Sequence, residues 1–263
     1  PKYIELYGEK KMKHNNSNRV VAIIEARMTS IRLPGKVLLK ACGKPLLAHL
    51  IERLQRAESL DEVIVATTVN DTDDPIACLA AQLGIGCFRG SEHDVLGRVL
   101  NAANEFNVDT IVEITGDCPA LDPKVVDICV AAFFEQKVHF LANRIKPLYP
   151  GGMDVRVLSK QTLKEVDLIS QDDPFAREHV SLPITDNAGK YKIYSLEAPP
   201  ELSMPELNIE LDEPDDYKMI KTVFEALYPG NPQFDLSDII SYIKKNPGIL
   251  EVNKNVARKD ARE

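Results

Sequence analysis

Apolar residues along the first half of the chain follow two alternating spacings. Short, continuously apolar runs rich in β-branched residues occur at 20–26, 63–67 and 110–115, and such runs are typical of strands buried on both faces of a parallel sheet. Between the runs, apolar residues recur every three or four positions, as at 46–54, which predicts amphipathic helices. This succession predicts an α/β fold, a Rossmann-like and mostly parallel sheet sandwiched by helices.

Residues with known positional preferences mark the starts of these helices. Pro45 is predicted to open the first helix, and Asp122 before Pro123 to cap the one that follows the third strand. Asp73, together with Asp74 and Pro75, is predicted to cap the helix 76–83 and form its first turn. The other elements predicted in this half are a short strand at 86–88 and a helix that ends at Ala103.

The pattern changes at about residue 138. Strand-like pieces at 139–143 and 153–158 flank a turn rich in proline and glycine at 149–152. They are followed by helices after Ser159 and Pro174, a strand at 191–196, a strand at 206–212 that ends in an aspartate, and two amphipathic helices up to residue 246. We interpret 19–250 as one domain that carries a small α+β insertion at about 138–200, followed by a flexible tail at 251–263.

The beginning of the chain does not have the composition of a membrane or export segment. Residues 1–18 are polar and charged, so we expect a disordered lead-in and not the apolar part of a signal peptide. No apolar run in the sequence approaches the length that a bilayer requires. We therefore expect a cytoplasmic protein that does not bind membranes.

Charge and cysteine content narrow the classes of function. The chain has 32 lysines and arginines against 40 aspartates and glutamates, a formal net charge of −8. This balance disfavours non-specific binding to nucleic acid or to anionic membranes. The five cysteines include no C-x-x-C spacing, so we expect buried or half-buried thiols in a reducing compartment and not a zinc or redox site.

One loop nevertheless concentrates positive charge. Arg27, Arg32 and Lys36 lie within ten residues of one another, directly after the first strand, at the edge where open α/β sheets bind ligands. The turn at 34–35 brings the backbone close to a bound group, and Ser30 adds a hydrogen-bond donor. Arginines can grip phosphate oxygens in pairs and lysine acts as a mobile point charge. The loop therefore predicts a triphosphate site.

Two aspartates are placed to assist that loop. Asp117 and Asp212 each follow a predicted strand, so we expect both at the sheet edge that carries the cationic loop. Mg²⁺ binds proteins through one or two carboxylates plus phosphate oxygens, and this pair could supply the carboxylates. Each aspartate taken alone could instead be a helix cap, because Asp117 precedes Pro119 and Asp212 precedes Pro214.

An ordered series of motifs resembles the sugar cytidylyltransferases. The likeness covers roughly residues 19 to 228 and is closest to the spore-coat polysaccharide SpsF-type proteins, within a group that includes the acylneuraminate and Kdo cytidylyltransferases. The segments that carry it are the loop from Ala26 to Lys36 (ARMTSIRLPGK), GKPLL at 43–47, VATT at 65–68, FRGS at 88–91, ITGDCP at 114–119, REHV at 177–180 and LDEPDDY at 211–217.

The resemblance implies a fold of the nucleotide-diphospho-sugar transferase type and specific roles for residues of this chain. It implies that Asp117 and Asp212 hold a catalytic Mg²⁺. Catalysis would depend on Arg27, Arg32, Lys36 and Asp117. The residues expected to contact the nucleotide are Ala26, Arg27, Ser30, Arg32, Leu33, Lys36, Thr67, Thr68, Arg89, Gly90 and Ser91. Because the family reads cytosine largely through backbone contacts, the residue types say little about which base is chosen.

The predicted insertion contains a second group of polar residues. By the same resemblance, we expect Asn143, Asp154, Arg177, Glu178 and His179 to bind the sugar, with Arg156 in the same cluster. His179 taken alone could equally be a hydrogen-bonded structural histidine. In related cytidylyltransferases this part of the chain crosses into a partner subunit, which implies a homodimer.

These observations predict a Mg²⁺-dependent enzyme that transfers CMP from CTP to a sugar or sugar acid and releases pyrophosphate, for surface polysaccharide or glycan biosynthesis. Three alternatives stay open: a guanylyl- or uridylyltransferase acting on a sugar 1-phosphate, a glycosyltransferase that uses a nucleotide sugar, and a nucleotide-binding regulatory protein without turnover.

Two other sequence patterns resemble functional motifs but are discounted. The D-x-D sequence at 71–73 is explained by helix capping, and the glycines at 84–86 follow a helix and lack the third glycine of a dinucleotide site.

Overall fold

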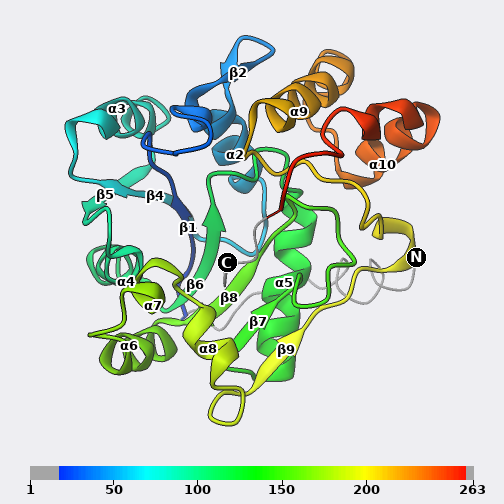
Figure 1. Ribbon diagram of the computed structural model, residues 1–263. Helices are drawn as coiled ribbons and strands as arrows, with labels where there is room; N and C mark the ends of the chain where they lie inside the picture. Colours follow the sequence, from blue (N-terminus) through cyan, green and yellow to red (C-terminus); the bar gives the residue numbers. More distant parts are fainter. Residues whose placement is uncertain (1–17, 259–263) are drawn as a thin grey trace.

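The computed structural model describes residues 18–258 and has a seven-stranded sheet at its centre, in the order β5-β4-β1-β6-β8-β7-β9 (Figure 1). β1 (Val20–Glu25) lies between β4 (Glu62–Thr68) and β6 (Thr110–Thr115) and runs parallel to both. β5 (Gly86–Gly90) continues the parallel part beyond β4. The strands predicted in the first half of the chain and their parallel arrangement are therefore confirmed.

Residues 138–200 extend this same sheet. β8 (Arg156–Ser159) pairs antiparallel with β6, β7 (Phe140–Ala142) pairs antiparallel with β8, and β9 (Ile193–Ser195) runs parallel to β7. The segment that we interpreted as an insertion thus supplies three strands of the main sheet, and its helices pack beside those of the first half.

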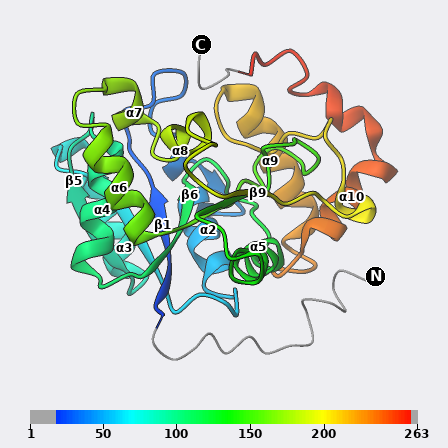
Figure 2. The ribbon, with the colours of Figure 1, turned by 90° about the horizontal axis from the view of Figure 1, so that it is seen from below.

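Helices cover both faces of the sheet, as Figure 2 shows. Alternate residues of β1 pack on opposite faces of the sheet, with Val20 and Ile24 in one apolar cluster and Val21 and Ile23 in the other. The first cluster includes side chains of α2 (Leu46–Leu54), α5 (Pro123–Gln136), α9 (Pro214–Leu227) and α10 (Leu236–Lys245). The second includes side chains of α4 (Val95–Glu105), α6 (Lys160–Ile169) and α8 (Leu182–Asp186), with α7 (Pro174–Glu178) packed against α4.

Shorter elements connect these layers. α3 (Asp74–Gln82) packs against β4 and β5, and a two-stranded hairpin is formed by β2 (Lys40–Ala41) and β3 (Lys44–Pro45). The short 3₁₀ helices are η1 (Lys36–Leu38), η2 (Asp71–Asp73), η3 (Pro200–Leu202) and η4 (Pro247–Glu251).

The predicted helix starts are confirmed in two cases and need correction in the third. Pro45 immediately precedes α2, and the carboxylate of Asp122 accepts a hydrogen bond from the backbone N–H of Lys124, 2.9 Å away. Asp73 occupies the cap position of α3, but its carboxylate does not cap the helix. It binds other residues, described below.

The strand predicted at 206–212 is wrong. The apolar residues at alternate positions of this segment do face the interior, because Leu207, Ile209 and Leu211 are all fully buried. The segment runs extended, but it makes only an isolated bridge, between Gly151 and Asn208. Its backbone N–H groups bond to two separate segments, that of Ile209 to the carbonyl of Gly151 and that of Leu211 to the carbonyl of Asp117, so no continuous ladder forms.

Several other expectations concern the ends and surface of the chain. Residues 1–17 of the predicted lead-in lie outside the described residues. The described part of the expected tail packs on the domain, where Asn253 and Arg258 both bind Asp216.

Two of the five cysteines, Cys42 and Cys78, are exposed, which corrects the expectation of buried or half-buried thiols for these two. Between residues 18 and 258, no helix combines the length and the apolar character needed to cross a bilayer.

Candidate active site

Three side chains that are far apart in sequence meet at the carboxyl edge of the parallel strands. The ammonium of Lys36, at the start of η1, lies 2.8 Å from Oδ2 of Asp117 and 3.1 Å from Oδ1 of Asp212. Asp117 follows β6, and Asp212 ends the extended segment. The expectation that these residues converge at one edge of the sheet is confirmed.

Backbone contacts hold this junction in place. The N–H of Leu211 donates to the carbonyl of Asp117 at 2.8 Å, which fixes the two aspartate-bearing segments side by side. Gly35, with φ of 71°, takes the left-handed conformation that only glycine adopts easily, and its N–H closes the loop onto the carbonyl of Met28 at 2.9 Å. The turn predicted at 34–35 therefore sets the direction in which Lys36 leaves the loop.

The electrostatics of the junction favour a cation between the two carboxylates. Burial raises the pKa of Asp117, and the negative charge of Asp212 adds to this, while Lys36 opposes it. Burial alone would lower the pKa of Lys36, but the charges of Asp117 and Asp212 outweigh it and raise that pKa. The carboxylate of Asp117 therefore depends on a nearby positive charge to stay ionised.

The donor set fits a magnesium ion that is shared with phosphates. Two carboxylates already converge on one positive charge, the ammonium of Lys36. Among residues 18–258, no group of three or more histidine, cysteine, aspartate or glutamate side chains is arranged to hold a metal. Mg²⁺ requires no such cage, because it commonly binds through one or two carboxylates with phosphate oxygens and water completing its shell.

The two loop arginines sit beside the junction in contact with acidic residues. Arg32 lies 2.7 Å from Oδ1 of Asp212, while Arg27 lies 3.7 Å from Oε1 of Glu92. Glu92 also accepts hydrogen bonds from Thr29 and Asn70, and the contact with Thr29 is the main cause of its lowered pKa. Ser30 and Leu33 are half-buried on the same loop, and Ala26 is buried. Glu92 was not singled out from the sequence.

The side chains expected to frame the nucleotide base are engaged within the protein. Thr67 and Thr68 are fully buried, and both hydroxyls donate to Oδ2 of Asp73. The other carboxylate oxygen of Asp73 accepts the N–H of Met28, so this residue ties the cationic loop to β4. The threonine side chains are therefore not available to a ligand, and only their backbone could contact one.

Arg89, Gly90 and Ser91 are similarly occupied. The guanidinium of Arg89 donates to the carbonyls of Thr68 and Asn70, each at 2.8 Å, and pairs with Asp74. The carbonyl of Gly90 accepts the N–H of Val69, and that of Ser91 accepts from Arg98. We conclude that Arg89 shapes this region and that its side chain is not free to bind a nucleotide.

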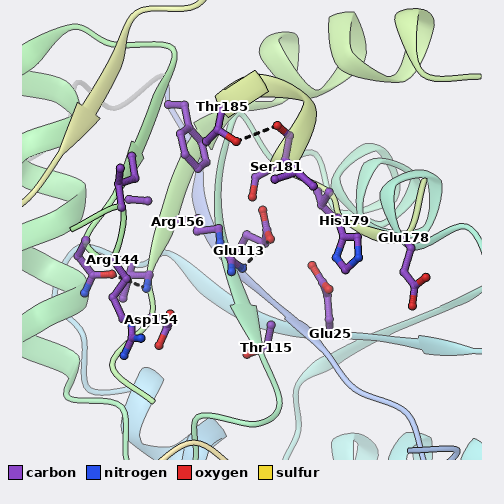
Figure 3. Close-up of a pocket in the computed structure, with 17 residues that line it drawn as sticks. Glu25, Glu113, Thr115, Arg144, Asp154, Arg156, Glu178, His179, Ser181 and Thr185 are labelled. Carbon is purple, nitrogen blue, oxygen red and sulfur yellow. Dashed lines mark hydrogen bonds and ion pairs between the residues drawn. The ribbon is translucent and has the colours of Figure 1, made fainter. Parts of the chain in front are cut away.

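Next to the junction, on the face covered by α7 and α8, lies a cavity of about 350 Å³ (Figure 3). Its volume lies within the range of small-molecule sites. The charged residues that line it are Glu25, Glu113, Arg144, Asp154, Arg156 and Glu178. The cavity reaches the carboxyl end of β1, immediately before the cationic loop.

The residues expected to bind the sugar divide into two groups. Asp154, Glu178 and His179 line the cavity. Asn143 also borders it, but its amide is used internally: it donates to the carbonyl of Met153 at 2.6 Å and accepts the N–H of Val155 at 2.9 Å. Asn143 therefore holds the loop between β7 and β8, and its side chain has little left to offer a sugar.

Arg177 is not among the cavity residues. Its guanidinium pairs with Asp94 at the start of α4 and with Asp167 in α6, at 2.6 and 2.5 Å. These ion pairs tie α7 to two neighbouring helices. The expectation that Arg177 contacts the sugar is thus replaced by a structural role, which positions the adjacent Glu178 and His179.

Comparison with known proteins agrees with this geometry. The cytidylyltransferase family profile matches residues 21–230. A cytidylyltransferase from Leptospira borgpetersenii serovar Hardjo-bovis is 33% identical and superposes with a TM-score of 0.84, covering 92% of this chain and 100% of that one. The chain belongs to the cytidylyltransferase family. It is a nucleotidyltransferase.

Two curated relatives of this cytidylyltransferase have more specific names. The spore coat polysaccharide biosynthesis protein SpsF of Bacillus subtilis is 30% identical over 234 residues, which cover 88% of this chain and 96% of that protein. A 3-deoxy-manno-octulosonate cytidylyltransferase of Nitratidesulfovibrio vulgaris is 40% identical over 121 residues, which cover 44% of this chain and 46% of that protein. Both agree with the family resemblance drawn from the motifs.

Two acidic residues of the cytidylyltransferase were missed by the sequence reasoning. Glu25 and Glu113 come from the adjacent strands β1 and β6 and line the cavity. Burial, helped by the charge of Glu113, raises the pKa of Glu25 to about 8. Burial also raises the pKa of Glu113, although Arg156, 3.0 Å away, opposes the shift. Charged residues inside apolar strand runs were the available clue, because buried carboxylates require a reason.

Proposed function

We propose that this cytidylyltransferase transfers CMP from CTP to a hydroxyl group of a sugar or sugar acid. The observation that carries the proposal is the junction of Lys36, Asp117 and Asp212, which lies beside a cavity of the size of a small-molecule site. A triphosphate at the cationic loop would present its α-phosphate toward an acceptor held in that cavity. The names of the relatives support a role in surface polysaccharide or glycan biosynthesis.

The reaction would be an in-line displacement. The hydroxyl oxygen of the acceptor attacks the α-phosphorus, the bond from that phosphorus to the oxygen bridging to the β-phosphate breaks, and pyrophosphate leaves. The proton of the attacking hydroxyl group is released to solvent. No protein nucleophile is required, so the residues act by positioning the reactants and by neutralising charge that develops during the transfer.

The cationic residues supply that charge. Lys36 lies at the centre of the junction and would neutralise the triphosphate and the departing pyrophosphate. Arg32 and Arg27 flank it and can bind phosphate oxygens through more than one N–H group each. All three now contact carboxylates, so we expect nucleotide binding to exchange these ion pairs for contacts with phosphate.

Asp117 and Asp212 would hold a Mg²⁺ ion. When bound, this ion would polarise the α-phosphate and stabilise its added charge. The two carboxylates fit the ion because they already share one positive charge and because burial and their mutual repulsion make a nearby cation favourable.

The decisive experiment is a matrix of the four nucleoside triphosphates against sugars, sugar acids and sugar 1-phosphates, with pyrophosphate release measured with and without Mg²⁺. Pyrophosphate that appears only with CTP and an unphosphorylated acceptor supports the proposal. Preference for GTP or UTP with a sugar 1-phosphate would favour the first alternative. Consumption of a nucleotide sugar would indicate a glycosyltransferase, and CTP binding without any pyrophosphate would indicate a regulatory protein.

The substitution Asp117→Asn provides a check on the assigned site. Loss of one carboxylate should lower kcat by a factor of about 100 or more, because charge stabilisation in the transition state is commonly worth that much. The circular dichroism spectrum should remain that of the wild type. A folded Asp117→Asn protein with normal turnover would remove Asp117 from the mechanism.

A homodimer and a cytoplasmic location remain part of the proposal. Three large apolar side chains near the end of α6 and in α7 are exposed, namely Leu168, Ile169 and Phe175. Such groups commonly contribute to protein interfaces. Light scattering after size-exclusion chromatography tests the dimer, and a monomer at micromolar concentration would exclude it. Fractionation of cells that express the untagged protein tests the location.

A further inference from the structure

We infer that Glu92 recognises the 2′- and 3′-hydroxyl groups of the nucleotide ribose, so that the protein selects ribonucleotides over deoxyribonucleotides. The inference rests on the proposed CMP transfer and names a specificity-determining residue for its nucleotide. Its basis is the position of one carboxylate between the loop expected to bind the phosphates and the strand ends expected to frame the base.

Glu92 joins two segments that are expected to lie on either side of the nucleoside. Its Oε1 accepts a hydrogen bond from the hydroxyl of Thr29, in the cationic loop. Its Oε2 accepts one from the side-chain amide of Asn70, two residues after β4, at 2.6 Å. In a nucleoside triphosphate the ribose lies between the base and the phosphates. A side chain that bridges the cationic loop and the end of β4 is therefore placed at the level of the ribose.

The backbone around Glu92 is fixed by contacts within the protein. The buried guanidinium of Arg98 donates to the carbonyl of Ser91 at 2.5 Å, and the hydroxyl of Ser91 accepts the N–H of Asp94 at 3.2 Å. Asp94 in turn caps α4 by accepting the N–H of Gly97 at 2.8 Å. The loop between β5 and α4 is thus anchored on both sides of Glu92, and a group that is already ordered loses little freedom when it binds a ligand.

The carboxylate of Glu92 can accept further hydrogen bonds. Its two oxygens offer about four acceptor positions, and Thr29 and Asn70 each use one of them. Arg27 lies 3.7 Å from Oε1, which is the distance of an ion pair and not of a hydrogen bond. The side chain of Glu92 is 21% exposed, so a ligand can reach it. Once Arg27 turns to the phosphates, the remaining acceptor positions are available to hydroxyl groups.

A negative charge at this position favours a ligand that donates hydrogen bonds. The pKa of Glu92 is lowered, mainly by the hydrogen bond from Thr29, so the side chain is ionised at neutral pH. An ionised carboxylate beside a triphosphate site repels the phosphates. Donor groups on the same ligand offset that repulsion, and the ribose hydroxyls are the donors of a nucleotide that lie closest to its phosphates. Carboxylates bind ribose hydroxyls in this way in dinucleotide sites.

Two other roles of Glu92 make different predictions. The amino group of cytosine is also a donor, but it lies at the end of the nucleotide remote from the phosphates. A carboxylate that bound it would discriminate CTP from UTP. A carboxylate that only anchored the cationic loop would support the binding of all nucleotides to the same degree.

The test compares nucleotides that differ by one hydroxyl group. Isothermal titration calorimetry with Mg²⁺ and without an acceptor gives Kd for CTP, 2′-deoxy-CTP, 3′-deoxy-CTP and UTP, and the ribo and 2′-deoxy forms of ATP and GTP extend the comparison to other bases. The proteins are the wild type, Glu92→Gln, Thr29→Val and Glu201→Gln. Thr29→Val removes the contact with the loop but keeps the carboxylate, and Glu201 is an exposed residue of η3.

We expect the wild type to bind CTP about 10-fold or more tightly than either deoxy form, because a hydrogen bond to a charged group is commonly worth that much. Glu92→Gln should bind CTP more weakly but 2′-deoxy-CTP at least as tightly as the wild type does, because the repulsion of the phosphates is removed. The preference for ribose should therefore fall to about 3-fold or less in this variant. Thr29→Val and Glu201→Gln should retain it.

The outcomes separate this inference from the proposed function. Equal affinity for CTP and its deoxy forms, or a ribose preference that survives Glu92→Gln, would overturn the inference and leave CMP transfer intact. The same holds if Glu92→Gln weakens every nucleotide by one factor or alters only the discrimination between CTP and UTP. Binding of none of the nucleotides would also overturn the inference. A ribose preference that depends on Glu92, without pyrophosphate from any acceptor, would support the inference and overturn CMP transfer.

Discussion

Arg258, close to the end of the described chain, forms a two-point ion pair with the fully buried carboxylate of Asp216, at 2.7 and 3.1 Å. The same carboxylate accepts the backbone N–H groups of Asp212 and Glu213. A residue outside the matched family segment thus supports the backbone that presents Asp212 to Lys36. The C-terminal segment is connected to the active site through one buried acid.

Loss of this ion pair should weaken both folding and catalysis. Arg258→Met leaves the buried carboxylate of Asp216 with only neutral partners, so we expect the free energy of unfolding to fall by roughly 1–3 kcal/mol, a value reduced because Arg258 is partly exposed. Urea denaturation followed by circular dichroism measures the change. The KM for CTP should rise as the Asp212 backbone loses support.

A double variant separates the ion pair from general disruption. Because Asp216→Asn removes the buried charge, Arg258→Met should cost less in that background than in the wild type. Equal losses in both backgrounds would show that Arg258 contributes packing and not charge.

Magnesium removal should weaken nucleotide binding through the two junction aspartates. CTP adds several negative charges to a site where Asp117 and Asp212 are already present, so we expect CTP to bind about 10-fold or more weakly in EDTA than with Mg²⁺. Isothermal titration calorimetry measures the difference. Asp117→Asn should reduce this Mg²⁺ dependence, whereas Asp172→Asn, at an exposed position, should preserve it.

Stability should decrease with rising pH because of Glu25. Its pKa is raised from 4.5 to about 8 by burial and by Glu113, so the folded state retains a proton that the unfolded state releases. This contribution is complete below about pH 4.5 and is lost as pH rises to about 8, at no more than about 1.4 kcal/mol per pH unit.

Urea denaturation of the wild type and Glu25→Gln between pH 4.5 and 8 checks the prediction. The variant should have a flatter profile, although Glu210, whose pKa is also raised to about 8 mainly by burial, should preserve part of the slope. Identical slopes in the two proteins would contradict the assignment to Glu25.

The sequence predicted most of what depends on local pattern. The parallel strands are continuous apolar runs, and such runs are typical of strands buried on both faces of a parallel sheet. The cationic loop and the two aspartates were found because the carboxyl ends of parallel strands share one edge. Lys36, Asp117 and Asp212 therefore meet as expected, with no need to know the distances beforehand.

What the sequence did not predict depends on partners that are distant along the chain. Arg89 and Arg177 looked like ligand-binding residues, but each is held by carboxylates from other elements, Asp74 for the first and Asp94 with Asp167 for the second. Conversely, Glu25 and Glu113 looked like parts of ordinary strands. Only the folded structure reveals which charged residues are already paired and which remain for a ligand.

Gly152 provides a final prediction about the segment that carries Asp212. Its φ of 87° is unfavourable for other residues, and an added Cβ would lie 2.6 Å from the carbonyl oxygen of Ile209. Gly152→Ala should therefore push the 206–212 segment away, lower the free energy of unfolding by about 1–3 kcal/mol and reduce kcat. Gly189→Ala, where a Cβ meets no atom within 4 Å, should change neither quantity. Equal stability of both variants would show that the packing of Gly152 against Ile209 does not constrain this segment.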